Sequence, residues 1–255
     1  MTPLRYTLIS QACCINSDVP DSEYSLAAVT VTQSERRRRW FELGLVLTIG
    51  FGSSFLYSLF YLQNGPQHVS PVSTLRWAVL IVQEVSTLFL LAYVLSRRAL
   101  GFGSIGLRWS PWEVGAGILL AFISYAAYAF GYGFVSTFRH AVSGTGATAR
   151  DVFGHPPLAM GIAFCILNPF VEELVVRAYL MTEITELTGS TVGAVILSVL
   201  VQFSYHLYYG WTGALSLSFQ FLVFALYYAY SRRALPLVVA HGFFDVYGMV
   251  RLLGG

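Results

Sequence analysis

Two adjacent glutamates, Glu172 and Glu173, and an arginine, Arg177, stand inside a long apolar stretch of the sequence. Charged side chains at membrane depth are costly, so they are rare and usually functional. On a helix, Glu173 and Arg177 lie one turn apart on one face and can form an ion pair. Glu172 points about 100° away from Glu173, which leaves its carboxylate free for acid–base chemistry. The alternative is a helix end whose charged groups reach the lipid headgroups.

Three further ionisable residues lie in apolar stretches later in the chain. His206 is close to the end of one stretch, where an interfacial role is the alternative to a catalytic one. His241 and Asp245 are four residues apart in the last stretch, on one face of a helix. An aspartate there needs a partner, and His241 is the nearest in sequence. The alternative for this pair is a structural contact that clamps two helices.

If these stretches converge, two carboxylates and two imidazoles share a pocket of low dielectric constant. Such a pocket offers a base for water and hydrogen-bond donors for an oxyanion, as hydrolysis requires. A divalent metal is the alternative, held by Glu172, His206, His241 and Asp245. The HExxH spacing of soluble zinc proteases is absent. The three cysteines, at positions 13, 14 and 165, form no zinc pattern.

The composition indicates a membrane protein. The chain has 255 residues, of which 56% are hydrophobic and 11% charged, with a mean hydropathy of +0.63; soluble domains carry about 25% charged residues. We predict an all-α, polytopic transmembrane bundle of about seven spans. The expected spans are roughly 43–62, 75–95, 112–135, 158–181, 191–209, 212–230 and 235–253. No internal repeat is visible, so one membrane domain, 41–255, follows a polar N-terminal tail, 1–40.

Arginine placement predicts the orientation. Arg36 to Arg39 directly precede the first span, and basic residues beside a span remain in the cytoplasm. With the N-terminus inside, ten arginines fall on the inner side and four on the outer side. We therefore expect a multi-pass protein of the cell membrane with a cytoplasmic N-terminus. Because the membrane rule already accounts for the basic run, no nucleic-acid partner is expected.

Three motifs resemble the CPBP intramembrane proteases, the CAAX protease and bacteriocin-processing (Abi) family, which includes type II CAAX prenyl endopeptidases. Glu172, Glu173 and Arg177 match its EExxxR motif. His241 matches the histidine of its HxxxN motif, with Asp245 in the asparagine position. His206 matches the histidine of FxxxH, but position 202 is Gln, and Phe203 is one residue out of register. The resemblance covers about residues 100–250, with the motifs within 168–250.

The resemblance implies an endopeptidase that cuts a peptide bond within or at the membrane. In the family's pattern Glu172 and His206 activate water, His241 and residue 245 stabilise the oxyanion, and Glu173 and Arg177 hold the geometry. A glutamate-dependent mechanism without metal is the preferred expectation, with zinc as the alternative. The expected partners are the lipid bilayer and a protein or peptide substrate, such as a prenylated CAAX protein.

Two other functions remain open. One is a proteolytically inactive relative that acts as a membrane scaffold or a bacteriocin self-immunity protein, which the departures at positions 202 and 245 allow. The other is a small transporter or proton relay, which the absence of an internal repeat disfavours.

The carboxylate of Asp245 poses a separate problem, because an ionised carboxylate cannot donate a hydrogen bond to an oxyanion. It could stay protonated, accept from His241, or ligate a metal. We favour the second arrangement, since His241 lies one helical turn away. We also predict that Arg177 pairs with Glu173 rather than with Glu172.

Overall fold

The structure is a computed structural model that describes residues 32–64, 72–138 and 153–254. Most of the predicted N-terminal tail, with Cys13 and Cys14, lies outside the described residues. Every regular element in the described part of the chain is helical, which confirms the predicted all-α class. The elements are α1 (Gln33–Asn64), α2 (Thr74–Ser96), η2 (Phe102–Ile105), α3 (Pro111–Thr137), α5 (Leu158–Glu172), η3 (Glu173–Tyr179), α6 (Leu180–Thr188), α7 (Thr191–Tyr205), η4 (Leu207–Tyr209), α8 (Gly210–Ser231) and α9 (Leu235–Gly254).

Six stretches of helix within the described residues are long and apolar enough to cross a bilayer. They are α1, α2, α3, the continuous helix Leu158–Thr188, the stretch Leu207–Ser231 and α9. The chain is therefore a multi-pass membrane protein. The predicted spans agree closely with these helices, except that α1 begins at Gln33, within the predicted tail.

The fifth predicted span is the exception in length. Its α-helix, α7, has only 15 residues, which corresponds to about 22 Å, against about 30 Å for the hydrocarbon core of a bilayer. The chain then turns through η4 and returns as α8, with Gly210 at φ +73° in the turn. Because α7 ends early, His206 at its C-terminus can lie within the bundle.

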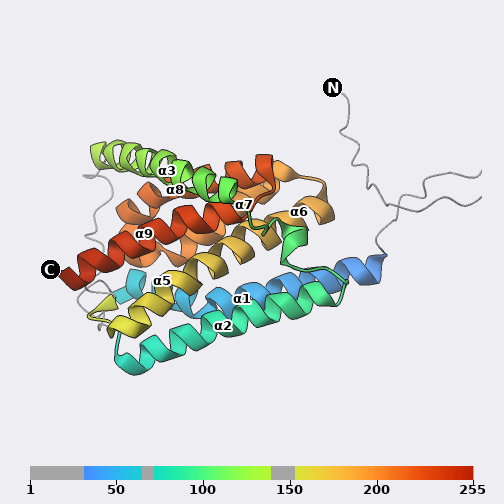
Figure 1. The fold of residues 1–255 in the computed structure, drawn as a ribbon, viewed down its shortest axis with the longest axis horizontal. Coiled ribbons are helices and arrows are strands. Elements are labelled where there is room, and N and C mark those ends of the chain that lie inside the picture. The colour runs from blue at the N-terminus through green and yellow to red at the C-terminus, as the bar shows by residue number, and fades with distance from the viewer. Residues whose placement is uncertain (1–31, 65–71, 139–152, 255) are drawn as a thin grey trace, which may run out of the picture.

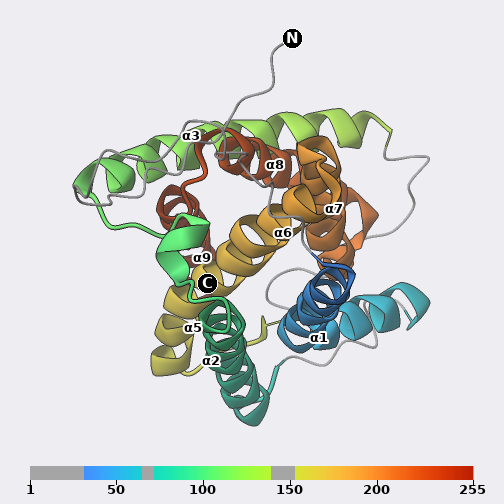
Figure 2. The ribbon, with the colours of Figure 1, turned by 90° about the vertical axis from the view of Figure 1, so that its right-hand side faces the viewer.

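The helix formed by α5, η3 and α6 runs through the middle of the bundle, with α2 and α9 packed against α5 (Figure 1). In the end-on view of Figure 2, α1 and α2 lie on one side of it and α3 on the other. All seven residues of η3 are buried. The central helix therefore holds its charged residues away from lipid.

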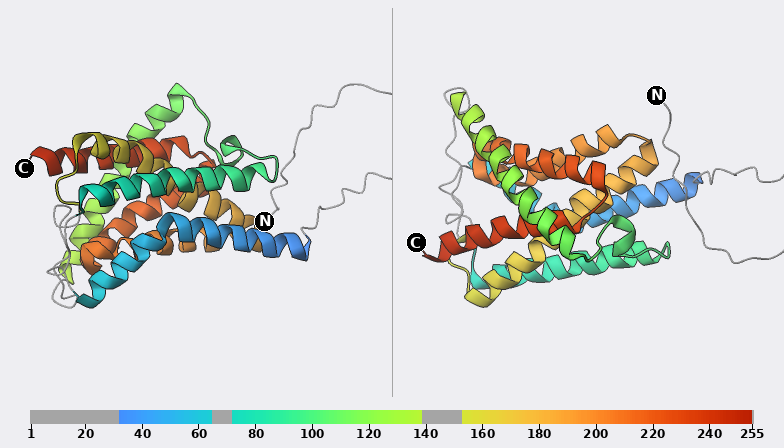
Figure 3. Two further views of the ribbon diagram at one scale, coloured as in Figure 1. Left: turned by 90° about the horizontal axis from the view of Figure 1, so that it is seen from below. Right: turned by 45° about the horizontal axis from the view of Figure 1, so that its top comes forward.

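The helix α3 packs on the outside of α8 and α9 and crosses the other helices obliquely (Figure 3). Glycines permit this close approach. A Cβ atom on Gly117 would lie 2.6 Å from Cβ of Val239, and one on Gly131 would lie 2.5 Å from the ring of Phe219. The opposite face of α3 exposes large apolar side chains, as a surface in contact with lipid does.

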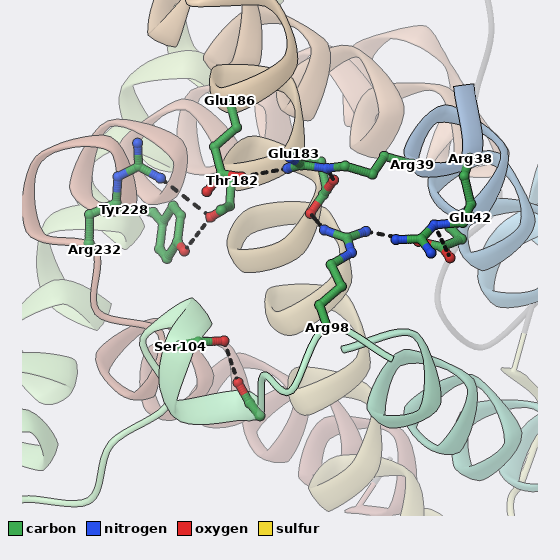
Figure 4. Close-up of polar contacts among 11 residues, drawn as sticks. Arg38, Arg39, Glu42, Arg98, Ser104, Thr182, Glu183, Glu186, Tyr228 and Arg232 are labelled. Atoms are coloured by element: carbon green, nitrogen blue, oxygen red, sulfur yellow. Dashed lines mark hydrogen bonds and ion pairs between the residues drawn. The ribbon is translucent and has the colours of Figure 1, made fainter. Parts of the chain in front are cut away.

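Buried ion pairs join three elements at one end of the bundle (Figure 4). Arg39 of α1 donates to Glu183 of α6 at 2.7 Å and to Glu186. Arg98, just after α2, donates to the other oxygen of Glu183 at 2.6 Å and to Glu42 of α1 at 2.9 Å. Arg39, Glu42 and Glu183 are each less than 10% exposed. These contacts fix the ends of α1, α2 and α6 relative to one another.

The same end of the bundle also holds Arg232, which follows α8 and donates to Thr182 of α6 at 3.3 Å (Figure 4). Arg39, Arg98 and Arg232 all belong to the set that the charge rule assigns to the inner side. Their gathering at one end agrees with that rule, and the orientation in the membrane stays a prediction.

Candidate active site

The local sequence disturbs the central helix just before its charged residues. Pro169 lies inside α5, and a proline removes the backbone N–H that would bond to the carbonyl four residues earlier. That carbonyl belongs to Cys165. The helix α9 passes close to this point at Gly242, where an added Cβ atom would lie 3.6 Å from Cγ of Pro169 and 4.0 Å from the carbonyl oxygen of Cys165. Pro169 and Gly242 thus mark the contact of α5 with α9.

From Glu173 to Tyr179 the helix widens into a π-helix, η3. Such wide turns are rare and occur often at functional sites. The change affects the predicted pair, because residues four apart are no longer stacked as in a regular α-helix. The Nε atom of Arg177 lies 3.9 Å from Oε2 of Glu173, so the two charges pair without a hydrogen bond. The structure thus contains the predicted pair as a loose contact.

Arg177 instead uses its terminal nitrogens to join α7 and α8 to the central helix. It is fully buried and donates to Ser198 at 3.1 Å, to Gln202, and to the carbonyl oxygen of Phe221 at 3.4 Å. Gln202 in turn donates to Oε2 of Glu172 at 2.7 Å. Arg177 therefore supports Glu172 indirectly, through the side chain of Gln202.

The carboxylate of Glu172 is held from one side. Its Oε2 atom accepts from Gln202 and from the hydroxyl of Tyr205, the latter at 2.8 Å. Tyr205 is itself buried and stacks on Phe51 of α1. Among the described residues, none donates to Oε1 of Glu172. One oxygen is thus fixed by the protein and the other is left for a ligand or water.

His241 is positioned by Glu173 rather than by its neighbour on α9. Its Nδ1 atom lies 2.8 Å from Oε1 of Glu173. An ionised carboxylate only accepts hydrogen bonds, so Nδ1 carries the proton. Glu173 is completely buried and, when ionised, stabilises a protonated imidazole ring. Its main partner is therefore His241, a contact that sequence spacing did not reveal.

His206 also has a defined tautomer. Its Nδ1 atom lies 2.8 Å from the backbone carbonyl of Gln202. A carbonyl only accepts, so Nδ1 donates and Nε2 of the neutral ring is an acceptor. The ring packs against Phe221 and is flanked by Tyr205 and Tyr208. A neutral His206 can thus accept a proton from water at Nε2.

The favoured arrangement for Asp245, a hydrogen bond accepted from His241, appears in this structure only as a loose contact. Oδ1 of Asp245 lies 3.7 Å from Nε2 of His241, too far for a hydrogen bond. Its Oδ2 atom accepts instead from the side-chain amide of Asn168 at 2.9 Å. Asn168 precedes Pro169 on α5, so this hydrogen bond joins α9 to α5. Asn168 thus supplies the hydrogen bond that Asp245 does not receive from His241.

One cavity of about 440 Å³ brings four of the six predicted residues together. Glu172, His206, His241 and Asp245 line it, and they come from α5, the end of α7, and α9. Glu173 and Arg177 lie behind them and are fully buried. Most of the remaining lining is aromatic or apolar, from Trp77, Tyr128, Phe164, Tyr209, Phe221 and Phe244. The cavity therefore combines a few ionisable side chains with a mostly aromatic and apolar lining.

The alternative metal set does not form. In the part of the chain that the structure describes, no three His, Cys, Asp or Glu side chains are grouped so that they could hold a metal ion. The Nδ1 contacts of His241 and His206 leave their Nε2 atoms free, so it is the placement of the side chains, and not a lack of donor atoms, that excludes the metal set. The side chains present do not fit a zinc site.

Sequence reasoning missed three residues of this site: Asn168, Gln202 and Tyr205. Gln202 was noted only as a departure from a motif. Its place within an apolar run was a usable signal, since an amide that is buried there needs partners on both its oxygen and its nitrogen; the structure buries Gln202 completely. Tyr205 and Asn168 carried no comparable signal, because an aromatic residue or an asparagine beside a proline is common in many settings.

Comparison with known proteins locates a family within the chain. Residues 154–247 match the model of the Rce1-like family, described as type II CAAX prenyl endopeptidase Rce1-like. This segment is an Rce1-like domain of the CPBP family. The match begins before α5 and ends within α9, so it contains every predicted site residue. No curated protein and no solved structure matches the chain.

The Rce1-like domain leaves α1, α2 and α3 outside the matched residues. These helices nevertheless contact the site. Phe51 of α1 stacks on Tyr205, and Trp77 of α2 and Tyr128 of α3 line the cavity. The family match therefore accounts for the charged residues of the site, and part of its enclosure comes from other helices.

Proposed function

We propose that this protein is an intramembrane endopeptidase that hydrolyses a peptide bond in a membrane-associated protein or peptide. The observation that carries the proposal is the shared cavity, in which Glu172, His206 and His241 face one apolar-walled space. The family of residues 154–247 is a membrane protease family, which supports the same reaction class.

Glu172 is the proposed base. Tyr205 and Gln202 fix its Oε2 atom, so that Oε1 can accept a proton from a water molecule. Nε2 of His206 is a second acceptor for that water. The water oxygen attacks the carbonyl carbon of the substrate, and the proton passes to the carboxylate. Transfer of this proton to the amide nitrogen then lets the C–N bond break, which yields a carboxylate and an amine.

His241 is the proposed oxyanion donor. With its Nδ1 proton held by Glu173, the protonated ring offers Nε2–H to the negative oxygen of the tetrahedral intermediate. In other hydrolases, removal of one such donor lowers kcat by about 10²–10³-fold. Asp245 lies beside it and supports α9 through Asn168.

The substrate class follows from the cavity walls. Aromatic side chains from α2, α3, α8 and α9 line the space above Glu172, and such walls suit an apolar segment or a lipid-modified peptide. A prenylated CAAX-type peptide is therefore one candidate, as is an unmodified hydrophobic peptide.

The test is cleavage of a peptide library by the purified protein in detergent, in water enriched in ¹⁸O. We expect cleavage with one ¹⁸O atom in each new carboxylate, detected by mass spectrometry, and none of this product with Glu172→Ala. Farnesylated and unmodified versions of each peptide distinguish the two substrate candidates. Identical cleavage by the parent and by Glu172→Ala would contradict the proposal, and no cleavage by the folded parent would favour a role as an inactive scaffold or immunity protein.

A further inference from the structure

Glu84, in the middle of α2, is a buried carboxylate without a partner. The side chain is only 8% exposed, and its Oε2 atom is inaccessible and has no hydrogen-bond partner. No described residue donates a hydrogen bond to either of its oxygens or forms an ion pair with it. A buried polar group of this kind requires an explanation, and an ionisable one at membrane depth is a candidate functional group.

Packing between α1 and α2 does not explain Glu84. The neighbouring Gln83 makes that contact: its amide donates to the carbonyl oxygens of Ile49 at 3.0 Å and Gly50 at 2.8 Å, and its oxygen accepts from Ser53 at 2.9 Å. Glu84 contributes no hydrogen bond to this interface. The position of a carboxylate here must therefore have another explanation.

Glu84 lines a second cavity, of about 180 Å³, between α1, α2 and α5. Glu172 lines this cavity as well, and so do Asn168 and Tyr208. These three residues also line the larger cavity. The proposed base thus lies in the wall common to both spaces, and Glu84 lines the second one.

The charges around this cavity favour a cationic occupant. An ionised carboxylate that is buried without a partner is costly, and a cation with hydrogen-bond donors would stabilise it. The cation on the cavity wall, Arg76, lies over the ring of Tyr57 at 4.8 Å. Arg76 is eight residues from Glu84 on α2, or about 12 Å along the helix axis, so it does not neutralise Glu84. A positively charged group in the cavity would face Glu84 and Glu172 together.

We propose that the cavity beside Glu84 is a subsite for a cationic nitrogen of the peptide substrate. This inference rests on the proposed function and extends it to specificity. Glu84 lies on α2, outside the residues that match the Rce1-like family, so the family match assigns it no role. The cation comes either from a lysine or arginine side chain next to the cleaved bond, or from the amine of the leaving fragment after protonation.

Paired substrates test the subsite and separate the two sources. Cleaved peptides from the library are resynthesised with lysine or Nε-acetyl-lysine at each position flanking the cut, and kcat/KM is measured. The leaving fragment is added as an inhibitor with a free or an acetylated α-amine. The parent is compared with Glu84→Gln and with a control, Glu113→Gln, which removes a buried carboxylate that pairs with Arg233 and lines neither cavity.

In one of these two comparisons, we expect the parent and Glu113→Gln to prefer the free amine over its acetylated form by about 10-fold or more. A hydrogen-bonded charge pair implies a preference of this size. In Glu84→Gln this preference should fall to about twofold or less. Preference for lysine identifies a side-chain subsite, and preference for the free α-amine identifies the leaving fragment. Equal preference in Glu84→Gln and the parent, or no preference in either arm, would overturn the proposal.

A readout without catalysis keeps the subsite separate from the proposed function. Dicyclohexylcarbodiimide adds to a carboxyl group that an apolar reagent can reach, and forms a stable N-acylurea with no other reactant. Site-resolved mass spectrometry should find this label on Glu84 and not on the ion-paired Glu42. A lysine peptide should protect Glu84 and its Nε-acetyl analogue should not. Protection of Glu84 without any peptide cleavage would support the subsite and contradict the proposed protease function. Cleavage with Glu84 unlabelled or unprotected would support the protease function and overturn the subsite.

Discussion

At the residue scale, the structure differs from the expectation based on sequence in the partners of the charged side chains. The motifs indicated which residues matter, and the four with atoms at the cavity do come together. Spacing along one helix suggested that Asp245 pairs with His241, and the two lie 3.7 Å apart, but the hydrogen-bonded partner of His241 is Glu173 of η3. Contacts within a helix can be inferred from spacing, whereas a contact between helices depends on their packing, which one sequence does not specify.

The Asn168–Asp245 contact changes what a substitution at Asp245 should do. Oδ2 of Asp245 accepts from the amide of Asn168, and the side-chain oxygen of an asparagine could accept the same hydrogen bond. The amide nitrogen of asparagine could also donate to the oxyanion, which an ionised carboxylate cannot. We therefore expect Asp245→Asn to retain at least the parent's kcat. Asp245→Leu, which cannot accept from Asn168, serves as the contrasting variant and should lower both kcat and thermal stability.

The measurement is peptide cleavage together with a thermal melt in detergent. A loss of about tenfold or more in kcat for Asp245→Asn, with an unchanged melting temperature, would show that the carboxylate itself is needed. That result would restore the arrangement in which Asp245 acts on His241.

At the element scale, the predicted spans match the helices closely, because long apolar runs and breaker residues determine span boundaries. The two features that shape the site were not predicted. One is the π-helix η3, which has no simple sequence signature. The other is the early end of α7 at Tyr205, since Leu207, Tyr208 and Tyr209 continue the apolar run. Both features depend on how neighbouring helices fill the space around them.

The ion pairs at the arginine-rich end give a prediction at this scale. Glu183 is 3% exposed and accepts from both Arg39 and Arg98. Removing one member of a buried charge network commonly costs about 3–5 kcal/mol, so Glu183→Gln should clearly lower the free energy of unfolding. Glu186→Gln is the matched control, because the Glu186 side chain is 55% exposed and exposed pairs contribute about 0–1 kcal/mol.

Thermal melts and urea titrations of both variants in one detergent provide the comparison. Equal destabilisation by Glu183→Gln and Glu186→Gln would mean that the buried contacts of Figure 4 do not hold α1, α2 and α6 together.

At the scale of the whole molecule, arginines assigned to the inner side gather at one end of the bundle, and this predicts the orientation. The long helices α1, α2, α3, the α5–α6 helix, α8 and α9, with the short α7, then leave the C-terminus outside the cytoplasm. A C-terminal alkaline phosphatase fusion should be active in cells, and a C-terminal green fluorescent protein fusion should be dark. A bright fluorescent fusion and an inactive phosphatase fusion would refute this orientation.

The central claim for the molecule is that its helices converge to make Glu172 the base that activates water. The most direct measurement is kcat of Glu172→Gln on a cleaved peptide, with a thermal melt to establish folding. The amide can keep a hydrogen-bonded contact with Tyr205 but cannot accept a proton from water, so kcat should fall by about 10²–10⁴-fold with little change in KM or melting temperature. A folded Glu172→Gln protein with the parent's kcat would contradict the claim.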